Sequence, residues 1–355
     1  VGELARQVAA WARRLSRPVT FMEVCGTHTN AIAAAGLRRL LPPQVRLISG
    51  PGCPVCVTPV GYVDQAIALA QQPENLVATF GDLLRVPASV GSLEQARALG
   101  CDVRVVYSPR DAVQLAAANP QRRVIFLGVG FETTVPTVAA ALWEALQQGV
   151  DNFFLLSGHK LIPPALAALL ADPVVRLDGL ILPGHVSVII GARAYRPVLA
   201  QYPVPAAITG FTPVDVLRSV VELVQQVVDG RAELVNLYGR VVREEGNPAA
   251  WRFVEQTFVP CDARWRGLGE IPLSGLALRP ELAARDAGHF PVALPEPREP
   301  VGCRCGDVLR GLLDPPQCPL FATACTPDTA VGACMVSAEG ACAAWYRHER
   351  GVGAA

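Results

Sequence analysis

The eleven cysteines of this 355-residue chain fall mainly into three groups whose spacing suits metal or redox chemistry. Six of them lie within the forty residues from Cys303 to Cys342. Two short motifs, Cys25-Gly-Thr-His28 and Cys53-Pro-Val-Cys56, lie far away in the sequence. We therefore expect a soft-metal cluster in the cysteine-rich segment, a second thiol site elsewhere, and a scaffold that brings the two into contact.

The cysteine-rich segment contains a set of four thiols that suits an iron–sulfur cluster. A cubane [4Fe-4S] cluster takes four thiolates, one for each iron. The set that we predict as its ligands has spacings of 14, 6 and 16 residues and consists of Cys303, Cys318, Cys325 and Cys342. Zinc also binds four thiolates, but its structural sites usually contain tight two-residue knuckles. Cys305 could replace Cys303, Cys334 could be a small buried hydrophobe, and scattered core thiols are the alternative for the whole set.

The Cys53-Pro-Val-Cys56 motif is a candidate redox pair. It follows a predicted strand and precedes a predicted helix, and a helix N-terminus lowers the pKa of a thiol. Such a pair can cycle between a dithiol and a disulfide. Half of a zinc site, or a chemically inert pair, is the alternative that the pattern leaves open.

The Cys25-Gly-Thr-His28 motif could hold a metal ion. Gly26 lets the loop curl, so that Cys25 and His28 can face one point. A thiolate with an imidazole suits iron, zinc or copper, and it also suits a Cys–His nucleophile pair. A buried cysteine beside a hydrogen-bonded histidine is the alternative.

Short apolar runs alternate with helical stretches over residues 19–230, as expected for parallel strands that are covered on both faces. The predicted strands are Val19–Val24, Val45–Ser49, Leu76–Phe80, Val103–Tyr107, Val124–Leu127, Phe153–Leu156, Gly179–Leu182 and Ala206–Thr209. The predicted helices include Val63–Gln71, Leu93–Leu99, Ala112–Ala118, Val138–Gln148 and Val214–Val228. Ser108 and Thr212 each precede a proline and an acidic residue, which predicts a capped helix start.

This alternation predicts an α/β protein with two doubly wound parallel-sheet domains that face a central cleft. We place the domains at residues 1–118, with both short thiol motifs, and at residues 119–230. Residues 231–355 would form an extended wrap, at 262–302, and the iron–sulfur region, with a closing helix over Ala338–Arg347. Ligands collect at the carboxyl ends of parallel strands. Besides the two thiol motifs, the residues at predicted strand ends are Asp82, Glu132, His159 and His185.

Composition excludes several classes of protein. The 31 basic and 31 acidic residues balance, so no charge excess indicates nucleic acid or an anionic membrane as a partner. No apolar run is long enough to cross a bilayer, and residues 1–17 lack the apolar core of a signal peptide. We therefore expect a cytoplasmic protein, in which cysteine clusters more often mean metal binding or catalysis than disulfides.

The motifs together resemble the HypD family of hydrogenase maturation proteins, in order and over nearly the whole chain. The strings that carry the resemblance are FMEVCGTHT, LISGPGCPVCVTP, FGDLLRVP, GVGFETTVPT, LLSGHKLIPPA, LPGHVSVIIG, WRGLG and the tail CPLFATACTP with GACMVSAEGACAAWY.

The resemblance implies a scaffold that builds the Fe(CN)2CO unit of [NiFe]-hydrogenases with a HypC-type small chaperone and a HypE-type cyanide donor. Cys25 would hold a transient Fe(II) that carries cyanide and carbon monoxide, with a chaperone cysteine as the other thiolate and His28 as a ligand or proton donor. Cys53 and Cys56 would be the redox pair, and the tail cysteines would bind the [4Fe-4S] cluster.

Two other functions remain open at this stage. A stand-alone iron–sulfur thiol oxidoreductase would need a closed apolar pocket for a small molecule at the strand ends. A scaffold would need an open, thiol-lined cleft that admits a partner's cysteine. A metal-storage or zinc-structural protein is the second alternative, and iron and sulfide analysis separates it from both.

Overall fold

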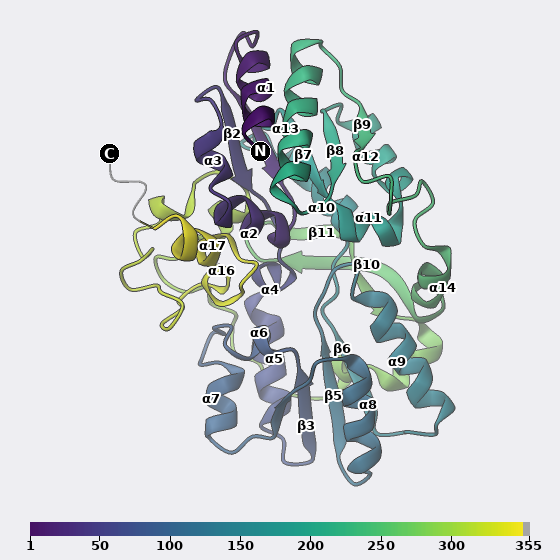
Figure 1. Cartoon of the computed structure of the whole chain (residues 1–355). Helices are drawn as coiled ribbons and strands as arrows, with labels where there is room; N and C mark the ends of the chain where they lie inside the picture. Colours follow the sequence, from purple (N-terminus) through teal and green to yellow (C-terminus); the bar gives the residue numbers. More distant parts are fainter. Residues whose placement is uncertain (351–355) are drawn as a thin grey trace.

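The computed structural model describes residues 1–350 and contains two parallel β-sheets, each flanked by helices (Figure 1). An antiparallel hairpin lies between the two sheets, and the cysteine-rich tail lies at one side, where the two halves meet (Figure 1). All eight predicted strands are present, which confirms the α/β class with parallel sheets.

The first sheet has five parallel strands in the order β2-β1-β7-β8-β9. Its strands are β1 (Val19–Glu23), β2 (Val45–Ser49), β7 (Gly179–Pro183), β8 (Ala206–Thr209) and β9 (Leu234–Asn236). Helices that pack on one face are α1 (Gly2–Ala12), α2 (Gly26–Ala34), α3 (Leu37–Leu40) and α13 (Pro213–Val228). The other face packs on α10 (Ile162–Ala171), α11 (Gly184–Ile190), η1 (Ala192–Tyr195) and α12 (Arg196–Gln201).

The second sheet has four parallel strands in the order β4-β3-β5-β6. Its strands are β3 (Asn75–Thr79), β4 (Val103–Val105), β5 (Arg123–Gly128) and β6 (Phe153–Ser157). The helices on its two faces are α8 (Pro109–Ala118) and α9 (Val135–Gln147), and α5 (Val60–Ala70), α6 (Gly81–Leu84) and α7 (Leu93–Ala98). The predicted caps are confirmed: Ser108 with Asp111, and Thr212 with Asp215, form capping boxes.

The strands are grouped differently from the predicted division between residues 118 and 119. After β2 the chain leaves the first sheet, builds the whole second sheet, and returns to add β7 beside β1, where Phe21 pairs with Gly179. The second sheet is therefore an insertion in the first. Strand neighbours in a parallel sheet are chosen by long-range packing, so the order of apolar runs in the sequence does not reveal them.

Residues after β9 contain more regular structure than the predicted extended wrap. Helix α14 (Pro248–Thr257) leads into the antiparallel hairpin of β10 (Phe258–Trp265) and β11 (Gly269–Leu278). Short elements follow: η2 (Pro280–Arg285), η3 (Ala287–His289), α15 (Cys305–Leu309), η4 (Pro315–Gln317), α16 (Ala333–Val336) and α17 (Ala341–His348). The last of these is the predicted closing helix.

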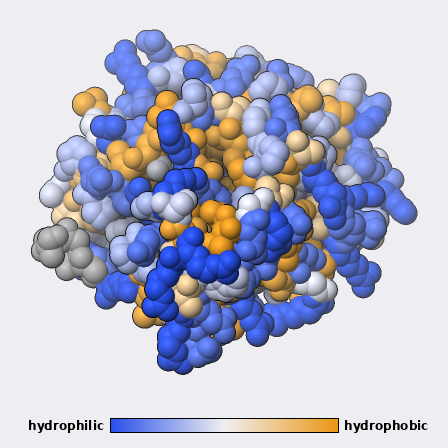
Figure 2. All heavy atoms as spheres, turned by 90° about the horizontal axis from the view of Figure 1, so that it is seen from above, coloured by the Kyte–Doolittle hydropathy of each residue, from blue (hydrophilic) through white to orange (hydrophobic). Residues whose placement is uncertain are grey.

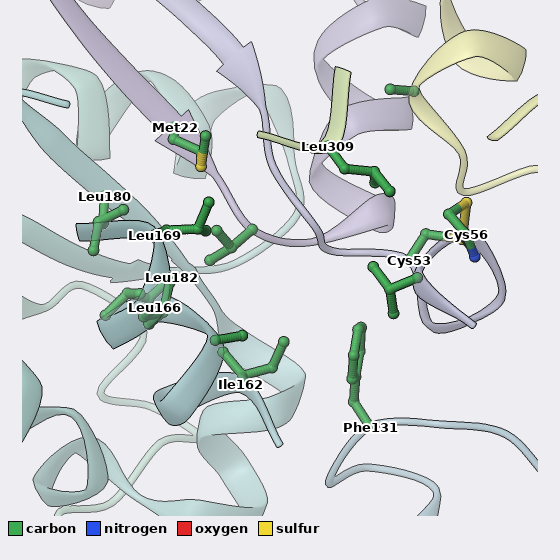
Figure 3. Packing of buried hydrophobic residues seen from close by; sticks show 14 of the residues in the cluster. Met22, Cys53, Cys56, Phe131, Ile162, Leu166, Leu169, Leu180, Leu182 and Leu309 are labelled. Atoms are coloured by element: carbon green, nitrogen blue, oxygen red, sulfur yellow. Dashed lines mark hydrogen bonds between the residues drawn. A yellow bond between two sulfur atoms is a disulfide. The ribbon is translucent and has the colours of Figure 1, made fainter. Parts of the chain in front are cut away.

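One apolar cluster joins the first sheet to the tail and to the Cys53–Cys56 segment. It contains strand residues such as Met22 and Leu180 together with several tail cysteines. Figure 3 shows Cys53 and Cys56 at one end of this cluster, near Leu309 of the tail and Phe131 of the second half. The tail is therefore part of the common core.

The outer surface over the first sheet is mostly hydrophilic, with small apolar patches between the polar side chains (Figure 2). No helix within residues 1–350 has the length and apolar character needed to span a membrane.

Candidate functional site

Cys25 lies in the turn between β1 and α2, where it is the N-cap residue of α2 and is 2% exposed. The loop that carries Cys53 packs directly against this turn. A side chain at Gly52 would overlap the backbone of Cys25, and the Gly26 N–H donates to the Gly52 carbonyl at 2.9 Å. Glycine is therefore required at position 52 because no Cβ fits between the two loops.

Cys53 and Cys56 form a disulfide, with their Cα atoms 5.2 Å apart. Cys53 is the N-cap of the four-residue helix α4 (Pro54–Val57), and the Cys56 N–H points to its sulfur at 3.2 Å. Both residues are buried. The helix predicted at Val63–Gln71 is present as α5 (Val60–Ala70), and the short helix α4 precedes it.

The cysteine-rich tail contacts both thiol motifs. A side chain at Gly26 would overlap Glu339, and the Thr27 hydroxyl donates to the Glu339 carboxylate at 2.8 Å. The Cys56 sulfur lies 3.9 Å from the Ala333 carbonyl oxygen, one residue before Cys334. Three segments that are distant in sequence thus meet at one junction, which we define as the loops at 25–29, 50–58 and 333–340.

All six tail cysteines line one small buried pocket. The Cys305 and Cys334 sulfurs are 2.7 Å apart, and Cys303 lies against Gly332. The pocket lining consists of Cys303, Arg304, Cys305, Val308, Cys318, Leu320, Phe321, Cys325, Gly332, Cys334, Met335 and Cys342. Soft sulfur donors that converge in a largely apolar space fit an iron–sulfur cluster.

The choice of four ligands among these six stays a prediction, because Cys303 and Cys305 both reach the pocket. Within residues 1–350, no three side chains of His, Cys, Asp or Glu have the geometry to hold a single metal ion. Bound at this pocket, a [4Fe-4S] cluster would be held by Cys318, Cys325 and Cys342 with either Cys303 or Cys305.

The histidine beside the Cys25 thiol is His185, at the start of α11. Both ring nitrogens of His185 lie 3.9 Å from the Cys25 sulfur. The ring of His28 turns elsewhere: its Nε2 hydrogen-bonds the Gly210 carbonyl at 2.8 Å, and it packs on Phe211. His185 was noted at a strand end without a role, and the Pro-Gly-His sequence after the seventh predicted strand was its signal.

Comparison with known proteins identifies the family. The family model HypD, described as the hydrogenase formation hypA family, matches residues 1–349. The chain belongs to the HypD family. It is 46% identical to the hydrogenase maturation factor HypD of Cupriavidus necator, over 98% of this chain and 95% of that protein. It is 47% identical to the factor of the same name from Escherichia coli, over 94% of this chain and 90% of that protein.

Burial controls the protonation of the thiol in this HypD-family junction. Burial raises the pKa of Cys25 to about 12, although the backbone amide of His28 favours the thiolate, and the charges of Glu23 and Glu339 raise the pKa further. Metal binding by Cys25 therefore requires a proton to leave a closed site. Burial also lowers the pKa of His185 below its usual value, which keeps its ring neutral and disfavours the protonated form.

Glu23 connects the strand to the thiol turn. Its carboxyl accepts hydrogen bonds from the Cys25 N–H at 3.1 Å and from the Thr29 hydroxyl. Burial raises the pKa of Glu23 to about 7. Burial likewise lowers the pKa of His28 to about 4, so His28 is a neutral ring whose visible role is to join α2 to the Gly210 loop.

The strand-end residues of the second sheet lie outside the junction, with one exception. Glu132 accepts from the Ile162 N–H at 2.8 Å, and His159 pairs with the Ser157 hydroxyl at 3.1 Å. Asp82 is the exception, because it accepts a hydrogen bond from Ser337 of the tail at 2.7 Å. Strand-end position alone therefore does not identify a member of this site.

A pocket of about 470 Å³ is lined by residues from both halves, among them Glu132, Ile189 and Trp251. None of the thiols in the three groups lines this pocket. The predicted thiol-lined cleft between two domains therefore stays a prediction.

Proposed function

We propose that this protein is a scaffold and redox factor in the assembly of the Fe(CN)2CO unit of [NiFe]-hydrogenases. It works with a HypC-type small chaperone and a HypE-type cyanide donor. Membership of the HypD family supports a role in hydrogenase assembly. The meeting of all three thiol groups at one junction supports a combined scaffold and redox role. That junction is the observation on which the proposal depends.

Cys25 is the residue that holds the ferrous cargo. A soft thiolate suits low-spin iron that carries cyanide and carbon monoxide. Because the thiol is buried and protonated, it must lose its proton when iron arrives, and the binding of iron must drive that transfer, for which the neutral ring of His185 lies 3.9 Å from the sulfur. A chaperone cysteine can reach the iron after the loop of His185 or the tail loop of Glu339 moves aside.

Cys53 and Cys56 store the electrons that assembly needs. Reduction breaks their S–S bond, consumes two electrons and two protons, and leaves two thiols. A [4Fe-4S] cluster in the tail pocket would supply those electrons one at a time when bound. Re-formation of the disulfide gives up two electrons and two protons, which the group delivered by the cyanide donor would take up as its cyanide is released to the iron at Cys25.

The variant Cys53→Ala tests this assignment. Anaerobically purified Cys53→Ala is expected to contain about four irons per chain, the same number as is expected for the wild type, because its tail ligands are intact. It is expected to give no hydrogenase maturation, since the disulfide can no longer form. Cys101→Ala, which removes a thiol outside all three groups, serves as the control and should mature hydrogenase normally. Full maturation by Cys53→Ala would contradict the proposal.

A further inference from the structure

Arg266, at the end of the hairpin strand β10, has an almost completely buried guanidinium, with its side chain 1% exposed. Its Nε donates to the Thr58 carbonyl at 2.9 Å, and its Nη1 donates to Glu299 at 3.0 Å. Its Nη2 is buried without a hydrogen-bond partner. Burying a charge costs free energy unless the charge is fully paired, so packing alone does not explain why an incompletely paired guanidinium is buried here.

The charge of Arg266 is only partly compensated. Its one carboxylate partner, Glu299, has a side chain that is 57% exposed. Water and salt weaken the field of an exposed carboxylate far more than that of a buried cation. A net positive potential therefore remains inside the protein around Arg266.

Arg266 binds the C-terminal end of α4, the helix that contains Cys56. The backbone N–H of Arg266 donates to the Val57 carbonyl at 2.8 Å, and the guanidinium donates to the next carbonyl, that of Thr58. These two residues directly follow Cys56. Backbone carbonyls at a helix C-terminus have no partner within the helix, and Arg266 supplies one for each of them.

The same strand end contacts the tail pocket. Gly267 has a φ of +81°, and a side chain there would overlap the backbone of Gly306, the residue after Cys305. Glu299 approaches from the segment that leads to Cys303. Arg266 thus contacts the segment that follows Cys56, while the next residue, Gly267, packs beside the lining of the tail pocket.

We propose that Arg266 is a positioning residue for the redox pair: it fixes α4 against the tail pocket, and its buried positive charge favours reduction of the Cys53–Cys56 disulfide. This inference rests on the function proposed above. Reduction places two electrons on the two sulfurs, and each sulfur that remains a thiolate instead of taking a proton carries a negative charge. A nearby fixed cation stabilises that charge and so shifts the equilibrium toward the reduced pair.

The test measures the reduction equilibrium of this one disulfide. The purified full-length protein is equilibrated anaerobically with set ratios of reduced and oxidised dithiothreitol and then alkylated. Mass spectrometry of the peptide with Cys53 and Cys56 gives the reduced fraction. Arg266→Met is expected to lower the equilibrium constant for reduction by about tenfold, and Arg266→Lys by less, because lysine keeps the charge.

Glu299→Gln gives the opposite test, because it removes the counter-charge and leaves the cysteines untouched. It is expected to raise the reduction constant. Arg285→Met is the matched control, since Arg285 is also largely buried and bonds the Val150 carbonyl at 3.1 Å, but it lies in η2 beside the second sheet. It should leave the constant unchanged.

Equal constants for Arg266→Met, Arg285→Met and the wild type would overturn the inference. If Arg266→Met lacks a cooperative thermal transition, Arg266→Gln decides, because it removes the charge but keeps hydrogen-bond donors, and an unchanged constant in that variant overturns the inference. This measurement needs no hydrogenase. A shifted constant together with full maturation by Cys53→Ala would therefore reject the proposed function and keep the role of Arg266.

Discussion

The two parallel sheets are built alike but carry different residues at the carboxyl ends of their strands. In the first sheet, β1 leads to Cys25, β2 leads to Cys53, and β7 leads to His185. In the second sheet, β5 leads to Glu132, which accepts from the Ile162 N–H at the start of α10, and β6 leads to His159, which bonds the nearby Ser157 hydroxyl. Both sheets therefore have loops at the carboxyl ends of their strands, and the two short thiol motifs lie in such loops of the first sheet.

The difference shows what makes a strand end into a site in this molecule. Each end that belongs to the junction is packed against a second segment: the turn of Cys25 against Gly52, and α4 against the tail. Asp82 is the one strand-end residue of the second sheet that reaches the tail, through Ser337. Contact between segments that are distant in sequence, rather than position in the sheet, distinguishes the site.

The largest expected effect comes from Cys25→Ser. The hydroxyl is a much weaker ligand for low-spin ferrous iron than a thiolate, so the cargo should be lost. The complex with the small chaperone, purified anaerobically, is then expected to show no infrared bands of metal-bound cyanide and carbon monoxide. Cys101→Ser, beside the second sheet, should keep these bands. Bands of wild-type intensity in Cys25→Ser would remove the distinction between the two sheets.

A second comparison uses one glycine after a strand in each sheet. Gly52→Ala is expected to lower the free energy of unfolding by about 3 kcal/mol, because its Cβ overlaps the backbone of Cys25, which cannot rotate away. Gly81→Ala should change it by less than about 0.5 kcal/mol, since its Cβ would meet Val105 at an ordinary 3.7 Å. Urea unfolding measures both values, and equal costs would contradict the close packing of the two thiol loops.

Glu132→Gln tests whether the carboxyl at the end of a strand of the second sheet is buried, through the pH dependence of the free energy of unfolding. Burial raises the pKa of Glu132 to about 7 from 4.5, so the folded protein keeps a proton that the unfolded chain loses between these pH values. The stabilisation is complete below pH 4.5 and is lost as the pH rises through 7. Glutamine has no carboxyl proton to lose, so the free energy of unfolding of the variant minus that of the wild type should rise by about 3 kcal/mol across this range.

Glu23→Gln is the matching variant in the first sheet. Burial raises the pKa of Glu23 to about 7 as well, so its difference curve should rise over the same pH range. A flat curve for either variant would show that its carboxyl is not buried as described.

The smallest expected effect concerns the contact between α2 and the tail. Thr27→Val removes the hydrogen bond to Glu339 and should lower the free energy of unfolding by about 1 kcal/mol. It should also speed the alkylation of Cys25, because the tail loop covers that residue. Thr137→Val, which removes a bond within α9, should leave that rate unchanged. Equal alkylation rates in Thr27→Val and the wild type would mean that the tail does not close the site.

Much of the fold could be predicted because buried parallel strands form continuous apolar runs, and all eight runs are strands. The hairpin of β10 and β11 could not. Pro260 lies inside β10 and argues against a strand there, although the other residues of β10 alternate in burial, and Leu273 in β11 has a positive φ that interrupts the second strand. The pairing of β1 with β7 depends on packing across the whole chain, which no local pattern encodes.

For the site, residue types were more informative than residue geometry. The thiol groups stand out by their spacing, and the junction brings them together. The choice of His185 over His28 as the neighbour of Cys25 depends on how two loops turn, since both histidines follow strands of the same sheet. Arg266 was not predicted as part of the site, because the sequence Trp-Arg-Gly-Leu-Gly does not indicate that its arginine is buried.

The central claim is that electrons delivered to the tail reach Cys53 and Cys56 within one chain. The most direct measurement reduces anaerobic protein with dithionite, without added thiol, and then alkylates it. We predict alkylated Cys53 and Cys56 in the wild type and an intact disulfide in Cys342→Ala, which lacks one predicted cluster ligand. A reduced cluster beside a disulfide that stays closed in the wild type would contradict the account.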